Sequence, residues 1–562
     1  MTEVSSPLNT RRNNIADIYP LSPMQEGILF HTVASPDTGL YMPQTALRLS
    51  GPVDADALKN AWQGMIDRHP ILRSAFYWEE RDQPFQVVFR RVPLSWTTLD
   101  WSDADEHETD KRLIDLKSAN RNAPFDLRKP PLLRLQWIRL KDEKSILLVS
   151  FHHIVLDGWS LKQLFNEAGQ LYLREIGADT PALPQARPYS DYIGWLKQQN
   201  RQASLGFWKD YLADIQVPEQ RLLHNGNSKG FERLRWECPP ALRQKLKTFS
   251  EALGITLNTL LQGALGLLIA RQTGRHDVIF GTTTSGRPAN LSGSTAMVGL
   301  FINTLPVRVT IAPQQTMQQW LVALQARQAA TTEHEHVPLR EIQGSGTELF
   351  DTLLVVENIV TEVEIETPLP FRLEGADFDE RTHFPLTIWV IPKPESLTFF
   401  VGFGSGSVDS KDISALVDNL AKLLSSMTDA RDEPLDLFME HMPAALDTEG
   451  FVSPGMFQQE QSKPLPIVRL GTAPATPTER LLVTTWSEVL QCDKLDSSAN
   501  FFELGGHSLL AARVVSRLRR ELALDLPVRS LFDRPVLRDL AGYIDELQEE
   551  NRRKTGHVEV TI

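Results

Sequence analysis

The stretch "SILLVSFHHIVLDGWSLKQLFNEAGQLYLRE" at residues 145–175 contains the local pattern from which the fold can be predicted. Its first part is almost continuously apolar, as is typical of a buried strand. Its last part predicts an amphipathic helix with Ser160 as the N-cap. The apolar side of that helix comprises Leu161, Leu164, Phe165, Ala168, Leu171 and Tyr172. The pattern therefore predicts strand, short loop and helix, with His153 at the strand end, where functional groups are often held.

The composition excludes several classes of protein. The chain has 562 residues, which at about 150 residues per domain predicts three or four folding units. A net charge of -13 argues against a nucleic-acid partner, which requires a basic face. The two cysteines, Cys238 and Cys492, lie far apart. We therefore expect no disulfide framework, no thiolate metal site and a reducing compartment.

The N-terminal sequence and the apolar runs bear on localisation. Residues 1–14 are polar and contain no apolar core of a signal peptide. No apolar run reaches the roughly 20 residues that a membrane span needs. We therefore expect a cytoplasmic protein with no membrane partner.

The order of predicted elements gives an α/β fold with two mixed halves. A helix is predicted at residues 55–70, with Leu58, Ala61, Trp62, Met65 and Ile66 on its apolar face. A second helix is predicted to stop at Gly274, and strands are expected around residues 277–283, 302–311, 349–357 and 385–391. A proline-rich stretch at 177–192 separates the halves. We expect a polar tail at 1–14, a first lobe at 15–180 and a second lobe at 181–446.

A smaller unit follows the two halves. Residues 447–478 are rich in Pro, Gly, Gln, Ser and Thr, as is typical of a linker. Residues 479–550 contain three or four helical segments and predict a small all-α domain. A C-terminal tail is expected at 551–562.

The all-α domain carries the motif "NFFELGGHSLLAARVVSRL" at residues 500–518. Ser508 lies just before a helix whose positive end would favour a phosphodiester, although an isolated serine at this place would be interpreted as an N-cap. The motif in its context closely resembles the four-helix peptidyl carrier domain of nonribosomal peptide synthetases. The resemblance implies covalent 4'-phosphopantetheine on Ser508, attached by a phosphopantetheinyl transferase.

The larger region resembles the condensation domain of the same synthetases. "HHIVLDG" at 152–158 is similar to the family motif HHxxxDG, and five further stretches follow the family's order. They are "LSPMQEGILFH" (21–31), "RHPILRSAF" (68–76), "DVIFGTTTSGRP" (277–288), "VGLFINTLPVRV" (298–309) and "HVPLREIQ" (336–343). The resemblance implies two chloramphenicol-acetyltransferase-like lobes in a V with a tunnel between them. Epimerisation, heterocyclisation and plant acyltransferase domains fit these motifs less well.

The resemblance also implies roles for the residues of the histidine motif. His153 is the expected functional group, either accepting a proton from the attacking amine or orienting it. Asp157 is expected to support the site through an ion pair with Arg68. Gly158 leaves room for substrate, and its backbone N–H is a candidate oxyanion donor. His152 is expected to be structural, because its side chain should point opposite to that of its strand neighbour.

Further matched residues carry weaker expectations. Trp208 matches an aromatic of the family, with core packing at least as good an interpretation. Ser285, Gly286 and Arg287 are expected to shape the bridge between the lobes. For Asn303 and His336, hydrogen bonding and lobe packing are favoured over catalysis.

The implied reaction is amide-bond formation between a donor thioester on an upstream carrier domain and the amine of an aminoacyl group on Ser508. No stretch resembles an adenylation domain between the two units, so we expect an adenylation enzyme to load Ser508 in trans, unless the chain is an excised or re-joined piece. Met1 and the tail favour a stand-alone protein. A downstream condensation or release enzyme is also expected, and the opening motif favours a D-configured donor. The alternatives are a non-catalytic recruitment platform and transfer of the carrier-bound acyl group to a soluble amine.

Overall fold

The computed structural model describes residues 14–34, 38–79, 83–215, 230–344, 348–356, 368–393, 396–405, 410–442, 474–490, 492, 495–501, 504, 508–524, 526–527, 530–531 and 534–555. The predicted tail at 1–14 and the predicted linker at 447–478 lie almost wholly outside these residues. Residues 556–562 and most of the segment "VRSLFD" at 528–533 also lie outside them.

The first lobe is built on a five-stranded sheet with the order β12-β2-β7-β6-β5. These strands are β2 (Gln44–Ser50), β5 (Ser95–Asp100), β6 (Leu133–Arg139), β7 (Lys144–Phe151) and β12 (Arg372–Asp379). The lobe's other elements are β1 (Ile15–Pro20), β3 (Ser74–Tyr77), β4 (Phe85–Phe89), α2 (Pro23–Ala34), α3 (Ala55–Arg68), α4 (Glu106–Arg121), α5 (Gly158–Glu175) and α6 (Ser190–Leu196).

Helices cover both faces of the central strand β7. Leu113 of α4 packs with Ile146 and Leu148 on one face. Ala61 of α3 and several residues of α5 share a core cluster with Leu147 on the other face. Because both faces are covered, every residue of β7 after the first is buried. This double cover explains the nearly continuous apolar run that predicted the strand.

The second lobe is built on a six-stranded sheet with the order β10-β9-β11-β13-β14-β8. Its strands are β8 (Gly230–Glu237), β9 (Asp277–Thr284), β10 (Asn303–Thr310), β11 (Thr352–Val356), β13 (Leu386–Pro392) and β14 (Leu397–Ser405). Its helices are α7 (Arg201–Tyr211), α8 (Pro240–Leu253), α9 (Leu257–Thr273), α10 (Met317–Thr331), α11 (Leu339–Gln343), α12 (Ser410–Asp429) and α13 (Leu435–His441). Gly274 ends α9 with a φ of 68°, as predicted.

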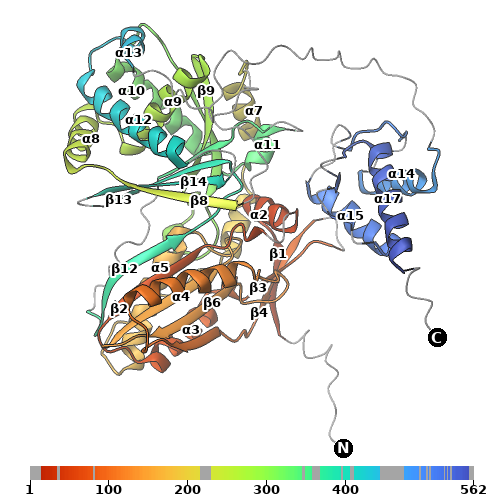
Figure 1. Cartoon of the computed structure of the whole chain (residues 1–562), viewed down its shortest axis with the longest axis horizontal. Helices are drawn as coiled ribbons and strands as arrows, with labels where there is room; N and C mark the ends of the chain where they lie inside the picture. The colour runs from red at the N-terminus through yellow and green to blue at the C-terminus, as the bar shows by residue number, and fades with distance from the viewer. Residues whose placement is uncertain are drawn as a thin grey trace, which may run out of the picture.

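Strand β12 joins the two lobes. It belongs by sequence to the second lobe, but it pairs antiparallel with β2 and becomes an edge of the first lobe's sheet (Figure 1). Tyr192 and Ile193 of α6 also lie in the first lobe's core. Two segments that follow the predicted lobe boundary at residue 180 therefore belong to the first lobe in space. They return there because a strand edge and apolar side chains are buried in that lobe.

The C-terminal unit contains α14 (Pro477–Leu490), α15 (Ser508–Leu522) and α17 (Leu537–Thr555). Its core includes Trp486 and Phe501, whose rings meet edge to face at 5.0 Å. Helix α17 continues past the predicted domain end at 550. Val33 of α2 packs against this core, and α15 lies against α2 in Figure 1. The carrier-like unit therefore contacts the first lobe.

No single helix among the described residues is long and apolar enough to cross a bilayer. Helices α8 and α9 reach that length and composition only as a pair bent by 106°.

Candidate active site

The histidine motif occupies the predicted connection between a strand and a helix. Strand β7 ends at Phe151, and α5 begins at Gly158. Ser160 is not the N-cap, as the sequence had suggested; Asp157 caps α5, and its Oδ1 accepts a hydrogen bond from the backbone N–H of Ser160 at 2.7 Å. The helix therefore starts earlier than predicted, with a carboxylate at its positive end, where negative charge is favourable.

His153 lies in a buried position with its ring held at both nitrogens. Its backbone N–H donates to the carbonyl oxygen of Tyr41, and the residue is only 5% exposed. Nδ1 lies 2.8 Å from the carbonyl oxygen of Leu156, which can only accept, so Nδ1 carries a proton. Nε2 lies 2.7 Å from Oε1 of Glu380. The end of β7 and the residue that directly follows β12 thus meet at this histidine.

Glu380 was not predicted. It directly follows β12 and lies 227 residues from His153 in the chain. The surrounding sequence "DFDERTHFP" shows no periodicity or motif that would connect an acidic residue with the histidine. Only the pairing of β12 with β2 carries Glu380 to the site.

His152 is directed to different partners, as expected for a strand neighbour. Its Nδ1 accepts a hydrogen bond from the backbone N–H of Ile154, and its Nε2 lies 3.2 Å from Oγ1 of Thr32 on α2. Burial, and then the charge of His153, lowers the pKa of His152 to about 3. His152 is therefore a neutral group that ties the motif to α2.

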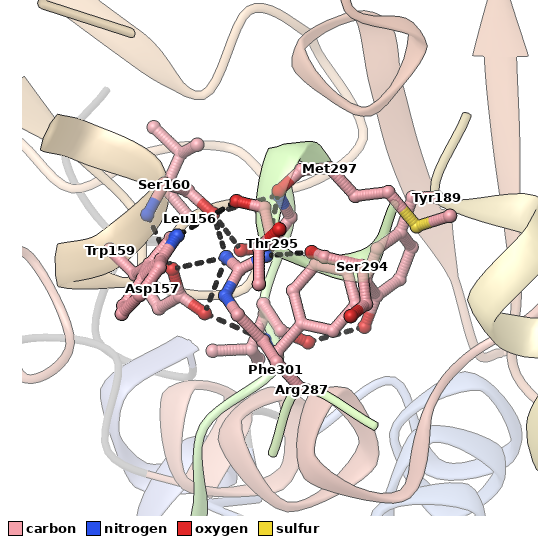
Figure 2. Close-up of polar contacts among 12 residues, drawn as sticks. Leu156, Asp157, Trp159, Ser160, Tyr189, Arg287, Ser294, Thr295, Met297 and Phe301 are labelled. Carbon is pink, nitrogen blue, oxygen red and sulfur yellow. Dashed lines mark hydrogen bonds and ion pairs between the residues drawn. The ribbon is translucent and has the colours of Figure 1, made fainter. Parts of the chain in front are cut away.

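Asp157 is surrounded by donors from both lobes (Figure 2). Besides Ser160, the backbone N–H of Phe301 donates to its Oδ2 at 2.9 Å, and the guanidinium of Arg287 approaches its Oδ1 at 3.2 Å. Both charged side chains are buried, with 0% exposure for Asp157 and 3% for Arg287. The same guanidinium nitrogen of Arg287 donates to Ser160 Oγ at 2.8 Å. This cluster fixes the start of α5 against the segment at 287–301.

The expected ion pair between Arg68 and Asp157 is wrong. Arg68 Nε instead donates to Oε2 of Glu167 at 2.6 Å, and its guanidinium also donates to the carbonyl oxygen of Pro184. Arg68 is the last residue of α3, and α3 packs along α5, which carries Glu167. Arg287 takes the predicted role because the segment that follows β9 passes directly over the start of α5.

A sequence model of the condensation domain matches residues 15–439, and a model of the phosphopantetheine attachment site matches residues 480–544. The chain belongs to the condensation-domain family. The histidine motif described above therefore lies in a condensation domain that is followed by a carrier domain.

Curated relatives are large synthetases of which the chain covers a small part. Over 426 residues the chain is 32% identical to tyrocidine synthase 2 of Brevibacillus parabrevis, covering 73% of this chain and 12% of that protein. It is 30% identical over 398 residues to gramicidin S synthase 2 of Brevibacillus brevis, covering 68% of this chain and 9% of that protein.

Solved condensation domains share the fold. The condensation domain of a monacolin K polyketide synthase superposes with a TM-score of 0.65 at 18% identity, covering 75% of this chain and all of that chain. This confirms the predicted α/β condensation fold.

The carrier domain bears covalent 4'-phosphopantetheine on a serine, as its family match indicates. Ser508 is the first residue of α15, a helix of 15 residues. An anionic phosphodiester fits there, because the first N–H groups of a helix are free and carry partial positive charge. The assignment of the attachment to Ser508 stays a prediction.

The remaining predicted residues have structural contacts. Trp208 is buried, and its indole N–H donates to the carbonyl oxygen of His334 at 3.0 Å, which supports core packing. Asn303 donates to the carbonyl oxygens of Glu335 and Val337, and His336 meets Trp195 edge to face at 6.0 Å.

Two glycines of the predicted motifs have defined places in the backbone of the condensation domain. Gly286 has a φ of 58°, and an added Cβ would lie 1.8 Å from the carbonyl oxygen of Phe301. Gly286 and Arg287 both lie in the segment that begins after Thr284 of β9, and the bridge role expected for this segment stays a prediction. Gly158 is the first residue of α5 and is half-buried.

Proposed function

We propose that this chain forms an amide bond between a donor acyl or peptidyl thioester on another protein's carrier domain and the amine of an aminoacyl group on its own carrier residue Ser508. The supporting observation is that one chain holds His153 in a fixed, buried setting and also carries a carrier helix, α15, that lies against α2 of the same lobe. His152 bonds to that same helix α2 through Thr32.

The chemistry required of the condensation domain is modest. The phosphopantetheine group supplies a thiol that holds the acyl group as an activated thioester. The protein must hold two reactants in contact, which by itself can lower the barrier by about 7–11 kcal/mol in favourable cases. It must also handle one proton and one developing negative charge on oxygen.

The motif residues divide these tasks. His153 contacts the attacking amine and either accepts its proton or orients it by a hydrogen bond. Asp157 holds the start of α5 in place through its bonds to Ser160 and Arg287. Gly158 at the start of α5 offers a backbone N–H toward the developing oxyanion, at the positive end of the helix.

The partners follow from the two domains. A phosphopantetheinyl transferase modifies Ser508, and an adenylation enzyme loads it in trans. An upstream carrier domain brings the donor, whose terminal residue is D-configured in our proposal. A downstream condensation or release enzyme takes the product.

Intact-protein mass on Ser508 tests the proposal. The carrier is loaded with an aminoacyl-phosphopantetheine and mixed with a donor peptidyl carrier, using wild type, His153→Ala and the control His107→Ala. His107 is an exposed histidine on α4. We expect a mass gain equal to the donor acyl group on wild type and on the control, and a rate about 10²–10⁴-fold lower in His153→Ala.

Other outcomes would contradict the proposal in distinct ways. A fully loaded wild type that gains no mass with several donor and acceptor pairs would favour a recruitment platform. Acyl product that leaves Ser508 on addition of soluble amines would favour transfer in the opposite direction. Equal rates in wild type and His153→Ala would remove His153 from the reaction.

A further inference from the structure

The contact between His153 and Glu380 requires a proton. Nδ1 of His153 already donates to the carbonyl oxygen of Leu156 at 2.8 Å, so a neutral ring has only a lone pair at Nε2. Oε1 of Glu380 lies 2.7 Å from this nitrogen. A lone pair and a carboxylate oxygen repel at that distance unless a proton lies between them. The pair therefore holds one proton at Nε2, on either the ring or the carboxyl group.

Glu380 is held at this place by contacts just before it in the chain. Asp377 and Asp379 of β12 form ion pairs with Lys117 and Arg121 on α4. These pairs, with the register of β12 on β2, fix the strand that ends immediately before Glu380. The glutamate side chain is 11% exposed and the histidine side chain 6% exposed, so solvent screens their interaction little.

Further titratable groups lie near Glu380 on separate segments of the chain. Tyr41 lies before β2, and burial, followed by the charge of Glu380, raises the pKa of its phenol. Arg233 of β8 donates to the carbonyl oxygen of Phe378 and feels the charge of Glu380. Arg381 follows Glu380 directly, and its guanidinium lies over Phe231 at 5.3 Å. Neither the phenol nor the two arginines exchanges a proton readily near neutral pH, whereas a histidine–carboxylate pair does.

We propose that Glu380 is the acid–base partner of His153, and that the pair receives the proton which the acceptor amine loses during condensation. This inference rests on the proposed condensation function. Because Nδ1 and Nε2 of the ring and Oε1 of the carboxyl group are all committed, the second carboxylate oxygen of Glu380 is the site left for a further proton, and His153 orients this carboxyl group.

The step balances within the two substrates. The amine nitrogen forms the new C–N bond with the donor thioester carbonyl and gives one proton to the second carboxylate oxygen of Glu380, while the proton shared between Oε1 and Nε2 stays in place. The C–S bond of the donor breaks, and the leaving sulfur takes one proton back from the pair. One proton has then moved from nitrogen to sulfur, and the pair has returned to its starting state.

Glu380→Gln tests the proposal, because glutamine keeps the shape and can still donate an N–H to Nε2 but cannot accept a proton. The matched control is Glu374→Gln, which removes another carboxylate of β12 whose side chain is 44% exposed and 4.0 Å from Lys144. With an aminoacyl acceptor, we expect condensation by Glu380→Gln to be slower by about 10²-fold or more. The control should match wild type.

A second acceptor separates proton transfer from a structural role. Ser508 is loaded with an aminooxyacetyl group, whose nitrogen is far less basic than an amino group, so the proton that it loses on forming the C–N bond is more acidic and depends less on a protein base. The loss in Glu380→Gln should shrink to about 10-fold or less with this acceptor. An equal loss with both acceptors would overturn the proton-receiving role and leave Glu380 as a packing residue.

A spectroscopic readout needs no turnover. In full-length protein labelled with ¹⁵N-histidine, His153 is assigned by its absence in His153→Gln. We expect Nε2 to be at least partly protonated at neutral pH in wild type and unprotonated in Glu380→Gln. Identical Nε2 resonances in the two proteins would overturn the shared proton. If wild type fails to condense at all, the proposed function fails; if it condenses and Glu380→Gln condenses equally well, only this inference fails.

Discussion

Two buried carboxylates at the histidine motif, Asp157 within it and Glu380 bonded to it, differ in their partners. Asp157 accepts hydrogen bonds from two backbone N–H groups and from Arg287, all of which keep their protons near neutral pH. Glu380 faces the imidazole of His153. The partners of Asp157 can only donate, and they hold the start of α5 in place, whereas a carboxylate and an imidazole can share one proton. The same side-chain chemistry thus serves architecture or reaction according to the groups that it faces.

The two carboxylates also join the lobes in different ways. Asp157 belongs to the first lobe and is bound by a segment from the second, at 287–301. Glu380 is delivered by β12, which the second lobe contributes to the first lobe's sheet. Both connections converge on residues 153–157, so the geometry of the site depends on both lobes.

The largest expected change in stability follows from removing the charged partner of Asp157. Arg287→Leu leaves the Asp157 carboxylate buried without its charged partner, and we expect the free energy of unfolding to fall by about 3–5 kcal/mol. Urea unfolding followed by tryptophan fluorescence measures it. The double variant Arg287→Leu/Asp157→Asn should recover part of the loss, since no unpaired charge remains.

Arg68→Leu is the matched control for this prediction. Glu167 keeps His69 and Gln163 as partners when Arg68 is removed, so the loss of stability should be smaller and condensation should remain. A larger loss in Arg68→Leu than in Arg287→Leu would contradict the assignment of Arg287 as the partner of Asp157.

Acid is expected to lower the stability of the folded chain through a cluster of buried aromatic and histidine side chains near Glu380. His31 of α2 stacks on His383 at 4.1 Å, and Tyr41 bonds to His383 at 2.5 Å. Burial lowers the pKa of His31 from 6.5 to about 4. The unfolded chain binds this proton at a higher pH than the folded chain, so stability is full above pH 6.5 and falls as pH drops toward 4. Between pH 7 and pH 5 the loss from His31 is about 2 kcal/mol.

Chemical unfolding at the two pH values checks this expectation. His31→Gln should show a weaker dependence on pH than wild type, and the exposed control His107→Gln should behave as wild type. Equal pH dependence in wild type and His31→Gln would show that His31 does not control acid stability.

The smallest expected effect concerns Glu380 itself. Glu380→Gln should change the free energy of unfolding by no more than about 1 kcal/mol, because glutamine can donate to Nε2 and avoids the desolvation of a charge. Urea unfolding of Glu380→Gln and of Arg287→Leu under the same conditions gives the direct comparison. A loss as large as that of Arg287→Leu would make Glu380 structural and erase the difference between the two carboxylates.

Local features were predictable because they depend on neighbours in the sequence. The face of α3 with Trp62 and Met65 followed from its period, and the end of α9 followed from Gly274. The strand–loop–helix around His153 followed from an apolar run next to an amphipathic one. The order of the motifs was sufficient to identify the condensation fold and the carrier domain.

Tertiary structure decided which charged groups meet. Two arginines, Arg68 and Arg287, lie in family-like motifs, and the sequence favoured the wrong one for Asp157. Glu380 was missed altogether, since 227 residues separate it from His153. Periodicity encodes which face of an element is buried, because burial depends on spacing along one helix or strand. It carries no information on which distant segment covers that face. That choice follows from the pairing of β12 with β2 and from the segment at 287–301 crossing α5.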